Sequence, residues 1–276
     1  MSHSVNKIDF FEPQVMAIVN VTDDSFYGES RTLDEEAIVK RVEEVVAQGA
    51  TIVDVGGYSS RPSATDVSEA SEWERVRRGI EAVRSVSADV AISVDTFRSG
   101  VARRAIEEFG DVIINDISAA ELSPDMIDVV ADAGVPYIAM HMRGTPQTMQ
   151  QLTVYEDGVV AEVRRYFEQR VDYMLSRGVK SIVLDPGFGF AKSVEQNFEL
   201  LASLSSICKL GYPVLAGLSR KSMICKTLGV RAEEALAGTI ALNWEALRQG
   251  ATILRVHDVR EATDVVKLYK QIKQIG

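Results

Sequence analysis

Polar side chains that could bind a small, polar molecule recur at spaced points along this sequence. One group supplies two carboxylates, an amide and an ammonium, a set that suits a heterocycle rich in hydrogen-bond donors and acceptors, such as an aminopyrimidinone. Its members are Asp95, Asn115, Asp185 and Lys221. The two carboxylates could also stabilise a positive charge that develops on such a ring.

A second group of side chains suits an anion. Arg255 and His257 stand two residues apart in "TILRVHDV" (252–259), and in a strand both would point to one face. Burying the two together is costly without a counter-charge, so we expect a negative partner. Arg61 and Asn20 join this group, because arginine matches phosphate oxygens and an amide oxygen can bind the Mg²⁺ that accompanies a diphosphate.

The elements that position these residues are short apolar runs that read as strands. They occupy residues 15–19, 51–55, 90–95, 111–116, 135–141, 181–185, 212–217 and 252–256. Nearly continuous apolarity without polar alternation is typical of parallel strands that are covered on both faces. The sequence therefore predicts eight buried parallel strands.

Stretches with helical periodicity separate these runs. They lie at 34–50, 71–86, 99–110, 123–134, 159–178, 194–211, 231–250 and 261–274, and several end in glycine. One unbroken series of strand–helix units of this length predicts a single α/β domain over residues 1–276, a (β/α)₈ TIM barrel. A doubly wound open sheet is the alternative, but "NVTDDSFYG" after the first run is no glycine-rich phosphate loop.

Polar residues close nearly every predicted strand, at the end where a barrel of this type places its chemistry. Asn20, Asp95, Asn115, Asp185 and Arg255 all fall there. Single residues at such positions are more often structural: the sequence favours turn or helix-cap roles for Asp54 and Asp116, and a near-core role for His141. The repetition around the barrel favours one shared site.

Composition excludes several other classes of protein. The chain has 276 residues, 46% hydrophobic and 25% charged, with a net charge of −10, which disfavours nucleic acid and anionic membranes as partners. No apolar run is long enough for a membrane span, and the N-terminus lacks a signal peptide pattern. Two cysteines, Cys208 and Cys225, fall in helical stretches without metal or redox spacing, so we expect a cytoplasmic protein.

The motifs, taken in order, resemble the dihydropteroate synthase family, the folate-pathway enzymes that sulfonamides inhibit. The resemblance covers nearly the whole chain. The motifs that carry it are "MAIVNVTDDSF", "VGGYSSRP", "SVDTF", "INDIS", "MHMRGTPQTMQ", "LDPGFGFAKS", "GLSRKSMI" and "LRVHDV". It implies a TIM-barrel transferase that joins 6-hydroxymethyl-7,8-dihydropterin diphosphate to p-aminobenzoate and releases pyrophosphate.

The resemblance also implies roles for individual residues. Asp95, Asp185 and Lys221 are the expected catalytic residues, and Asp95, Asn115, Met140, Asp185 and Lys221 the pterin pocket. Asn20, Arg61, Arg255 and His257 are the expected diphosphate site, with Asn20 as the Mg²⁺ ligand. Phe26, Ser60, Arg61, Pro62, Phe188, Lys221 and Ser222 are the expected p-aminobenzoate site. A homodimer and sulfonamide binding are expected from the same resemblance.

Departures from the family pattern fall in two loops. Asp23 stands where proline is common, and Tyr58, Ser60 and Ser63 replace the usual glutamate, threonine and glycine. They affect the loops and sulfonamide affinity more than the reaction. Three other interpretations stay open on the residues: a methyltetrahydrofolate:corrinoid methyltransferase, an aldolase with a Schiff base on Lys221, and a pterin-binding protein without activity.

Overall fold

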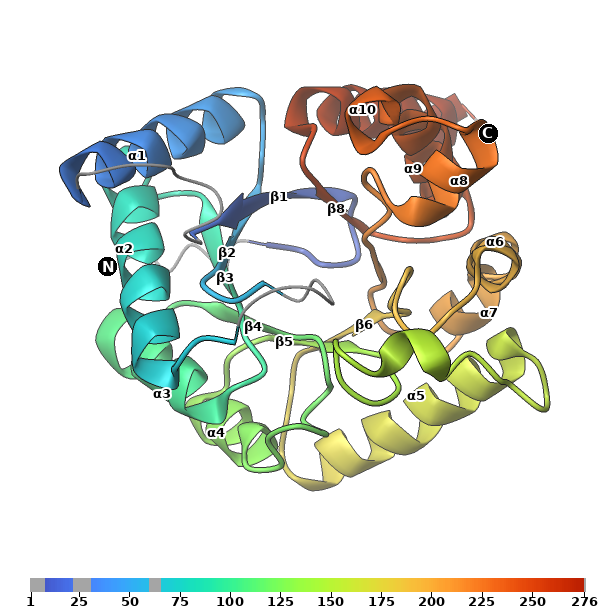
Figure 1. Ribbon diagram of the computed structural model, residues 1–276, viewed down its shortest axis with the longest axis horizontal. Helices are drawn as coiled ribbons and strands as arrows, with labels where there is room; N and C mark the ends of the chain where they lie inside the picture. Colours follow the sequence, from blue (N-terminus) through green and yellow to red (C-terminus); the bar gives the residue numbers. More distant parts are fainter. Residues whose placement is uncertain (1–7, 22–30, 60–65, 276) are drawn as a thin grey trace.

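A cylinder of parallel strands forms the centre of the computed structural model, which describes residues 8–21, 31–59 and 66–275 (Figure 1). The strands are β1 (Gln14–Asn20), β2 (Ile52–Gly56), β3 (Ala91–Asp95), β4 (Ile113–Asp116), β5 (Tyr137–Met140), β6 (Ile182–Asp185), β7 (Leu215–Ala216) and β8 (Ile253–Val256). They lie in the order β6-β5-β4-β3-β2-β1-β8-β7, and their pairings are parallel.

The outermost strands of this order, β6 and β7, meet and close the sheet. Leu184 and Val214 form a parallel bridge between them. The amide of Leu184 also donates to the carbonyl oxygen of Pro213 at 2.9 Å. Strand order around the cylinder follows chain order without the reversal of a doubly wound sheet. The predicted (β/α)₈ barrel is confirmed, and the open-sheet alternative is wrong.

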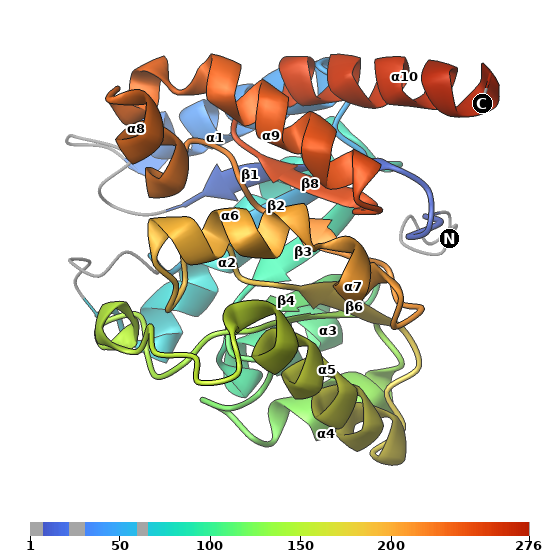
Figure 2. The ribbon, with the colours of Figure 1, turned by 90° about the vertical axis from the view of Figure 1, so that its right-hand side faces the viewer.

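Helices surround the strands as an outer ring (Figures 1 and 2). They are α1 (Arg31–Ala47), α2 (Glu69–Val86), α3 (Ser99–Phe109), α4 (Met126–Ala133), α5 (Val159–Ser176), α6 (Val194–Ala202), α7 (Ser205–Cys208), α8 (Ser222–Leu228), α9 (Leu236–Arg248) and α10 (Val259–Ile275). The range 194–211, expected as one helix, is broken into α6 and α7 around Ser203. Clustered serines explain the break, because their hydroxyls compete for backbone hydrogen bonds.

Inside the barrel, an apolar layer lies below the polar side chains. Each strand contributes one member: Met16, Ile52, Ala91, Ile113, Ile138, Val183, Leu215 and Ile253. Ile8 and Phe10 pack against this layer. Because every second residue of a strand shares a face, the next inward positions are polar on most strands. The barrel therefore has a dry floor and a polar upper half.

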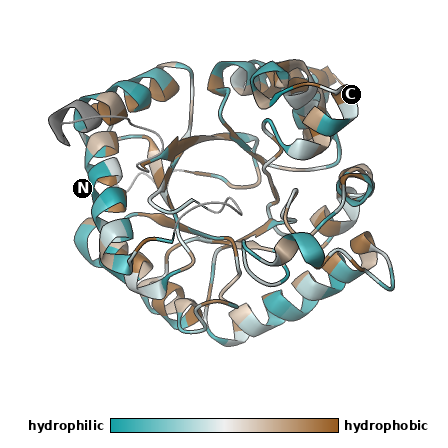
Figure 3. Ribbon diagram, viewed as in Figure 1, coloured by the Kyte–Doolittle hydropathy of each residue, from teal (hydrophilic) through white to brown (hydrophobic). Residues whose placement is uncertain are grey.

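The opposite face of each strand packs against the helices and forms the larger core. Val53, Ile114 and Leu184 belong to this outer core, which continues through the helix faces that are turned toward the barrel (Figure 3). Burial on both faces explains why the strands are almost continuously apolar. Within the described ranges, no helix combines the length and apolar character that crossing a membrane would require.

Candidate active site

The polar side chains predicted to act together do meet at the carboxyl ends of the strands, and we call this region the mouth. Asn115 lies near the end of β4, Asp185 is the last residue of β6, and both are nearly fully buried. Asp95 is the last residue of β3 and is partly exposed. Arg255 reaches the same space from β8. The strand register thus gathers residues that are up to 160 positions apart in the chain.

The guanidinium of Arg255 lies between two carboxylates. Its Nε donates to Oδ2 of Asp54 at 2.6 Å, and its Nη2 donates to Oδ2 of Asp95 at 2.5 Å. Burial works against the charge on Arg255, but the two aspartates outweigh it and raise the pKa of Arg255 above its usual range. The negative partner expected for Arg255 is therefore present within the protein itself, as the carboxylates of Asp54 and Asp95.

Asp54 is the residue whose role was misread from the sequence. The turn role that its position favours is wrong, because its side chain is fully buried inside the barrel. Its Oδ2 accepts from Arg255 and also from Nδ2 of Asn115, at 3.1 Å. Asp54 thus links the strand that carries Arg255 to a residue of the expected pterin pocket.

Asp116, in contrast, has the structural role expected for it. It faces away from the barrel interior and accepts from the amides of Ser118, at 2.7 Å, and Ala120, at 2.8 Å. The hydroxyl of Tyr137 also donates to this carboxylate, at 2.8 Å. Asp116 therefore shapes the loop that follows β4.

Lys221 and Asp185 form a second charged group in the mouth. Lys221 lies on the same side as Arg255, because a Cβ added to Gly217 would lie 3.9 Å from Nζ of Lys221 and 4.0 Å from Cβ of Arg255. Nζ of Lys221 donates to the carbonyl oxygen of Phe188 and lies 4.9 Å from the ring centre of Phe190. Burial lowers the pKa of Lys221 to about 8, although Asp185 opposes that shift. Burial likewise raises the pKa of Asp185, and Lys221 is the strongest opposing charge. Each group therefore favours the charged form of the other.

Two glycines allow the loop after β6 to approach this pair. Gly187 has a φ of +69°, and a Cβ added there would lie 2.1 Å from the carbonyl oxygen of His141. Gly189 has a φ of +82°, and its added Cβ would lie 3.2 Å from Cδ of Lys221. Both positions exclude larger residues. The amide of Gly187 also donates to Oδ1 of Asp185 at 2.8 Å, which orients that carboxylate.

Asn20 and His257 stand at the outer rim of the mouth, and both are exposed. A Cβ added to Gly56 would lie 3.2 Å from Oδ1 of Asn20 and 3.8 Å from Oδ2 of Asp95, so the amide and the carboxylate flank the same glycine. Nδ1 of His257 lies 3.2 Å from the hydroxyl of Ser219. The rim therefore presents polar groups, and the charge of Arg255 is close enough to His257 to act on its imidazole.

An apolar wall completes the mouth. Met140 is 3% exposed and packs with Ile117, Met142, Met149 and Ala191, and Phe97 and Phe190 border this cluster. The expectation of an apolar wall at Met140 fits this position. Such a surface suits the flat face of an aromatic ring.

Only some of the residues expected to bind p-aminobenzoate belong to the part of the chain that the structure describes. Phe26, Ser60, Arg61 and Pro62, together with the variant positions Asp23 and Ser63, lie outside the described residues. Ser222 is exposed at the first turn of α8. The side chain of Phe188 is not at the mouth, because it is fully buried in the outer core and only its carbonyl oxygen reaches Lys221. Phe190, which sequence reasoning missed, presents its ring there instead.

The variant residue Tyr58 lies within a charged cluster beside β3. Its ring meets Phe97 edge-on at 5.1 Å between centroids, and the guanidinium of Arg98 lies 5.2 Å from the Tyr58 ring centre. Arg98 Nη1 also donates to Oε2 of the fully buried Glu72 at 2.9 Å. Tyrosine thus replaces the family's glutamate without leaving Arg98 unpaired.

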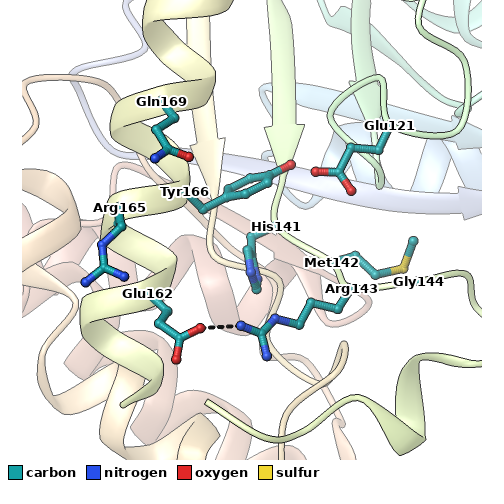
Figure 4. A pocket seen from close by; sticks show the side chains of 9 residues that line it. All are labelled: Glu121, His141, Met142, Arg143, Gly144, Glu162, Arg165, Tyr166 and Gln169. Atoms are coloured by element: carbon teal, nitrogen blue, oxygen red, sulfur yellow. Dashed lines mark hydrogen bonds and ion pairs between the residues drawn. The ribbon is translucent and has the colours of Figure 1, made fainter. Parts of the chain in front are cut away.

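A cavity of about 320 Å³ lies outside the mouth, between α5 and the loop that follows β5 (Figure 4). Its lining residues are Glu121, His141, Met142, Arg143, Gly144, Glu162, Arg165, Tyr166 and Gln169. His141 is nearly fully buried here, with its ring edge-on to Tyr166 at 4.8 Å. The near-core role expected for His141 agrees with this position.

Comparison with known proteins gives a consistent answer over nearly the whole chain. The sequence model of the family described as "Pterin binding enzyme" matches residues 16–257. The chain is 41% identical over 265 residues to dihydropteroate synthase of Haemophilus influenzae, covering 95% of this chain and 95% of that protein.

Solved structures agree with the sequence comparison. Dihydropteroate synthase of Xanthomonas albilineans with 4-aminobenzoic acid superposes with a TM-score of 0.88 at 39% identity, covering 96% of this chain and 95% of that chain. Dihydropteroate synthase of Yersinia pestis in a sulfonamide drug complex superposes with a TM-score of 0.88 at 35% identity, covering 97% and 96%.

The ion pair between Asp54 and Arg255 predicts a specific loss of stability. In Asp54→Asn, the shape of the side chain is kept but the buried guanidinium loses one counter-charge. Removal of one member of a buried pair typically costs about 3–5 kcal/mol, and we expect about 3 kcal/mol because the Arg255 side chain is 22% exposed. The measurement is the free energy of unfolding of the ligand-free protein in urea.

Asp66→Asn is the matched control for this experiment. Asp66 also pairs with an arginine, Arg98, at 3.1 Å, but its side chain is 76% exposed. Exposed ion pairs contribute about 0–1 kcal/mol, so this variant should unfold almost like the wild type. Equal losses of stability in the two variants would contradict a central role for Asp54.

Proposed function

The chain belongs to the pterin-binding enzymes and, within them, to the dihydropteroate synthases, and we propose that the mouth of its barrel performs the condensation. The reaction joins 6-hydroxymethyl-7,8-dihydropterin diphosphate to p-aminobenzoate and yields 7,8-dihydropteroate and pyrophosphate. The observation that carries this assignment is the arrangement of Arg255 between Asp54 and Asp95, in the same mouth as the oppositely charged Asp185 and Lys221. The curated relatives do not favour the alternative corrinoid methyltransferase.

The pterin ring occupies the buried half of the mouth in this proposal. Asp185 accepts from ring N–H groups, Asn115 offers an amide that both donates and accepts, and Lys221 donates to a ring acceptor. Met140 and its apolar cluster cover one face of the ring. Asp54 fixes Asn115 from below through the 3.1 Å hydrogen bond, so the amide is oriented before the ligand arrives.

The diphosphate lies at the rim. Asp54 and Asp95 engage Nε and Nη2 of Arg255, so we assign its remaining nitrogen, Nη1, to a phosphate oxygen. His257 follows two residues later, just beyond the end of β8, and we assign it to this end together with Arg61, which lies outside the described residues. The rim therefore receives the negative charge of the leaving group.

Bond cleavage comes first in the proposed reaction. The bond between the exocyclic carbon and the diphosphate oxygen breaks, and the oxygen keeps the electron pair as pyrophosphate leaves. The positive charge on the carbon spreads into the pterin, where Asp95 and Asp185 stabilise it. The neutral amine of p-aminobenzoate then forms the C–N bond and releases a proton. Because no covalent enzyme intermediate is required, Lys221 needs no role as a Schiff base.

We propose that Mg²⁺ accompanies the diphosphate. Asn20 would hold it through Oδ1, which is exposed at the rim beside Gly56 and so fits a cation that keeps several waters and takes one or two protein oxygens. When bound, the ion would neutralise charge on the departing pyrophosphate.

We place p-aminobenzoate, and sulfonamides that resemble it, at the exposed side of Lys221. The relatives from Xanthomonas albilineans and Yersinia pestis were solved with such ligands. Here the ring of Phe190 and the exposed Ser222 border that side, with Phe26, Ser60, Arg61 and Pro62 assigned to it from outside the described residues. An aromatic wall beside an ammonium suits a benzoate ring with its charge.

The proposed reaction can be tested directly. Purified protein, supplied with 6-hydroxymethyl-7,8-dihydropterin diphosphate, p-aminobenzoate and Mg²⁺, should release dihydropteroate and pyrophosphate in equal amounts, and chelation of the metal should slow both. Asp185→Asn should lower kcat by about 10²-fold or more, because one stabilising charge is lost. If the wild type forms no dihydropteroate, the proposed function fails.

The ammonium of Lys221 sets an upper pH limit for pterin binding. With the pKa of Lys221 lowered to about 8, its ammonium is present below that pH and is lost as pH rises through it. We therefore expect binding of 6-hydroxymethyl-7,8-dihydropterin to weaken above about pH 8. In Lys221→Arg the charge persists, so that limb should move to higher pH even though overall affinity falls. An unchanged alkaline limb in this variant would contradict the assignment.

We propose that the protein is a cytoplasmic homodimer that pairs through α10. Leu268, Ile272 and Ile275 form one stripe on this helix and are 63%, 60% and 87% exposed. A stripe of this kind on an outer helix is typical of a surface that another chain covers. The two free cysteines, both partly buried, are consistent with a reducing compartment.

The dimer proposal predicts a change of mass in solution. Light scattering should give twice the chain mass for the wild type, and the double substitution Leu268→Glu with Ile272→Glu should give a monomer that keeps its fold. Leu175→Glu, on α5 and 47% exposed, is the control and should remain dimeric. A wild-type protein that is monomeric at micromolar concentration would exclude the proposal.

A further inference from the structure

We infer that Lys192 is a positioning residue of this active site, which fixes the loop after β6 and supplies positive charge behind Asp185. It touches no substrate in the proposed function, on which this inference rests. It lies in "GFGFAKS", directly before Ser193, which caps α6. Its side chain turns back beneath the loop and is 5% exposed.

Three acceptors surround the ammonium of Lys192. Nζ lies 3.0 Å from Nδ1 of His141, 3.0 Å from the carbonyl oxygen of Gly187 and 3.0 Å from that of Phe190. An ammonium has three N–H donors, so each finds a partner. A buried lysine that is satisfied in this way is a fixed point of the structure and not a solvated side chain.

The acceptors lie on both sides of the residue that holds Lys221. Gly187 and Phe190 enclose Phe188, whose carbonyl oxygen accepts from Lys221. Lys192 therefore holds the loop from beneath while Lys221 contacts it from the mouth. Displacement of this loop would shift Lys221 and the ring of Phe190 together.

The positive charge of Lys192 also acts on the mouth. Burial lowers the pKa of Lys192 to about 7, and Asp185 is the group that opposes this shift most. Burial raises the pKa of Asp185, and Lys221, Arg255 and Lys192 are the charges that oppose this shift. The other charges that act on Lys192 are Lys221 at the mouth and Arg143 in the loop after β5, both repulsive.

His141 takes part as an acceptor. Burial, with Lys192 and Arg143 nearby, holds the pKa of His141 well below its usual range, so its ring is neutral. With Nδ1 accepting from Lys192, the ring proton lies on Nε2. Figure 4 shows His141 between the Tyr166 ring and the Arg143 side chain, at the edge of the outer cavity. The rings of Tyr155 and Tyr166 also face His141, and Lys192 carries the positive charge of this contact below its own pKa of about 7.

Lys192→Met tests the contribution of charge, with binding of 6-hydroxymethyl-7,8-dihydropterin measured by fluorescence from about pH 4 upward. Without the lysine, Asp185 should take up its proton at higher pH, so the acid limb of binding should move up by about one pH unit and affinity below it should fall about tenfold. Titration of the pterin itself is common to both proteins. Lys180→Met, an exposed lysine before β6, is the matched control and should leave the acid limb in place.

Lys192→Arg tests whether Lys192 fixes the position of the loop after β6. This variant also keeps the inference testable if Lys192→Met does not fold. Arginine keeps the charge but cannot reproduce the three contacts, so the acid limb should stay in place while KM for p-aminobenzoate rises several-fold. A merely structural lysine would instead lower stability alone. An unmoved acid limb in Lys192→Met, or an unchanged KM in Lys192→Arg, would overturn the inference. Wild-type turnover in the same assay separates this result from a failure of the proposed function.

Discussion

Everything at the mouth depends on the balance of buried charge in the upper half of the barrel. Ionised groups lose their hydration there, and each must recover that loss from an opposite charge or a hydrogen bond. The carboxylates are Asp54, Asp95 and Asp185, and the cations are Arg255, Lys221 and Lys192. Because the opposite charges are held close to one another, the protein keeps charged groups in place within a largely buried site.

The balance also explains how one site can serve both a cation and an anion. The carboxylates face the part of the mouth where positive charge would develop on a pterin. The guanidinium of Arg255, on β8, and the imidazole of His257, just after β8, lie toward the rim, where pyrophosphate would leave. The apolar floor beneath them and the full burial of Asp54 lower the local dielectric around the ion pairs, which strengthens each interaction. The stability of the fold and the proposed reaction thus both require opposite charges to be held close together inside the barrel.

Much of this could be predicted from the sequence. The eight apolar runs coincide with β1 to β8, because strands buried on both faces leave an unmistakable pattern. A barrel requires that the ends of those strands meet, so the strand pattern alone predicts that Asp95, Asn115, Asp185 and Arg255 share one site.

What could not be predicted depends on which way individual side chains turn. The sequence favours a turn role for Asp54 and cannot reveal its ion pair, because its partners lie 61 and 201 positions away in the chain. The conformation of the loop at Gly187 and Gly189 decides that the ring of Phe190, and not that of Phe188, faces the mouth. Lys192 could not be recognised as a site residue from the sequence, because only its place in a motif distinguishes it.

The most direct test of the central claim is a crystal structure of the protein with 6-hydroxymethyl-7,8-dihydropterin and pyrophosphate bound together. We expect the pterin ring between Met140 and Asp185, pyrophosphate on Arg255 and His257, and an Asp54–Arg255 pair that keeps its 2.6 Å contact. A pterin bound outside the mouth, or a guanidinium that leaves Asp54 to reach the pyrophosphate, would contradict it.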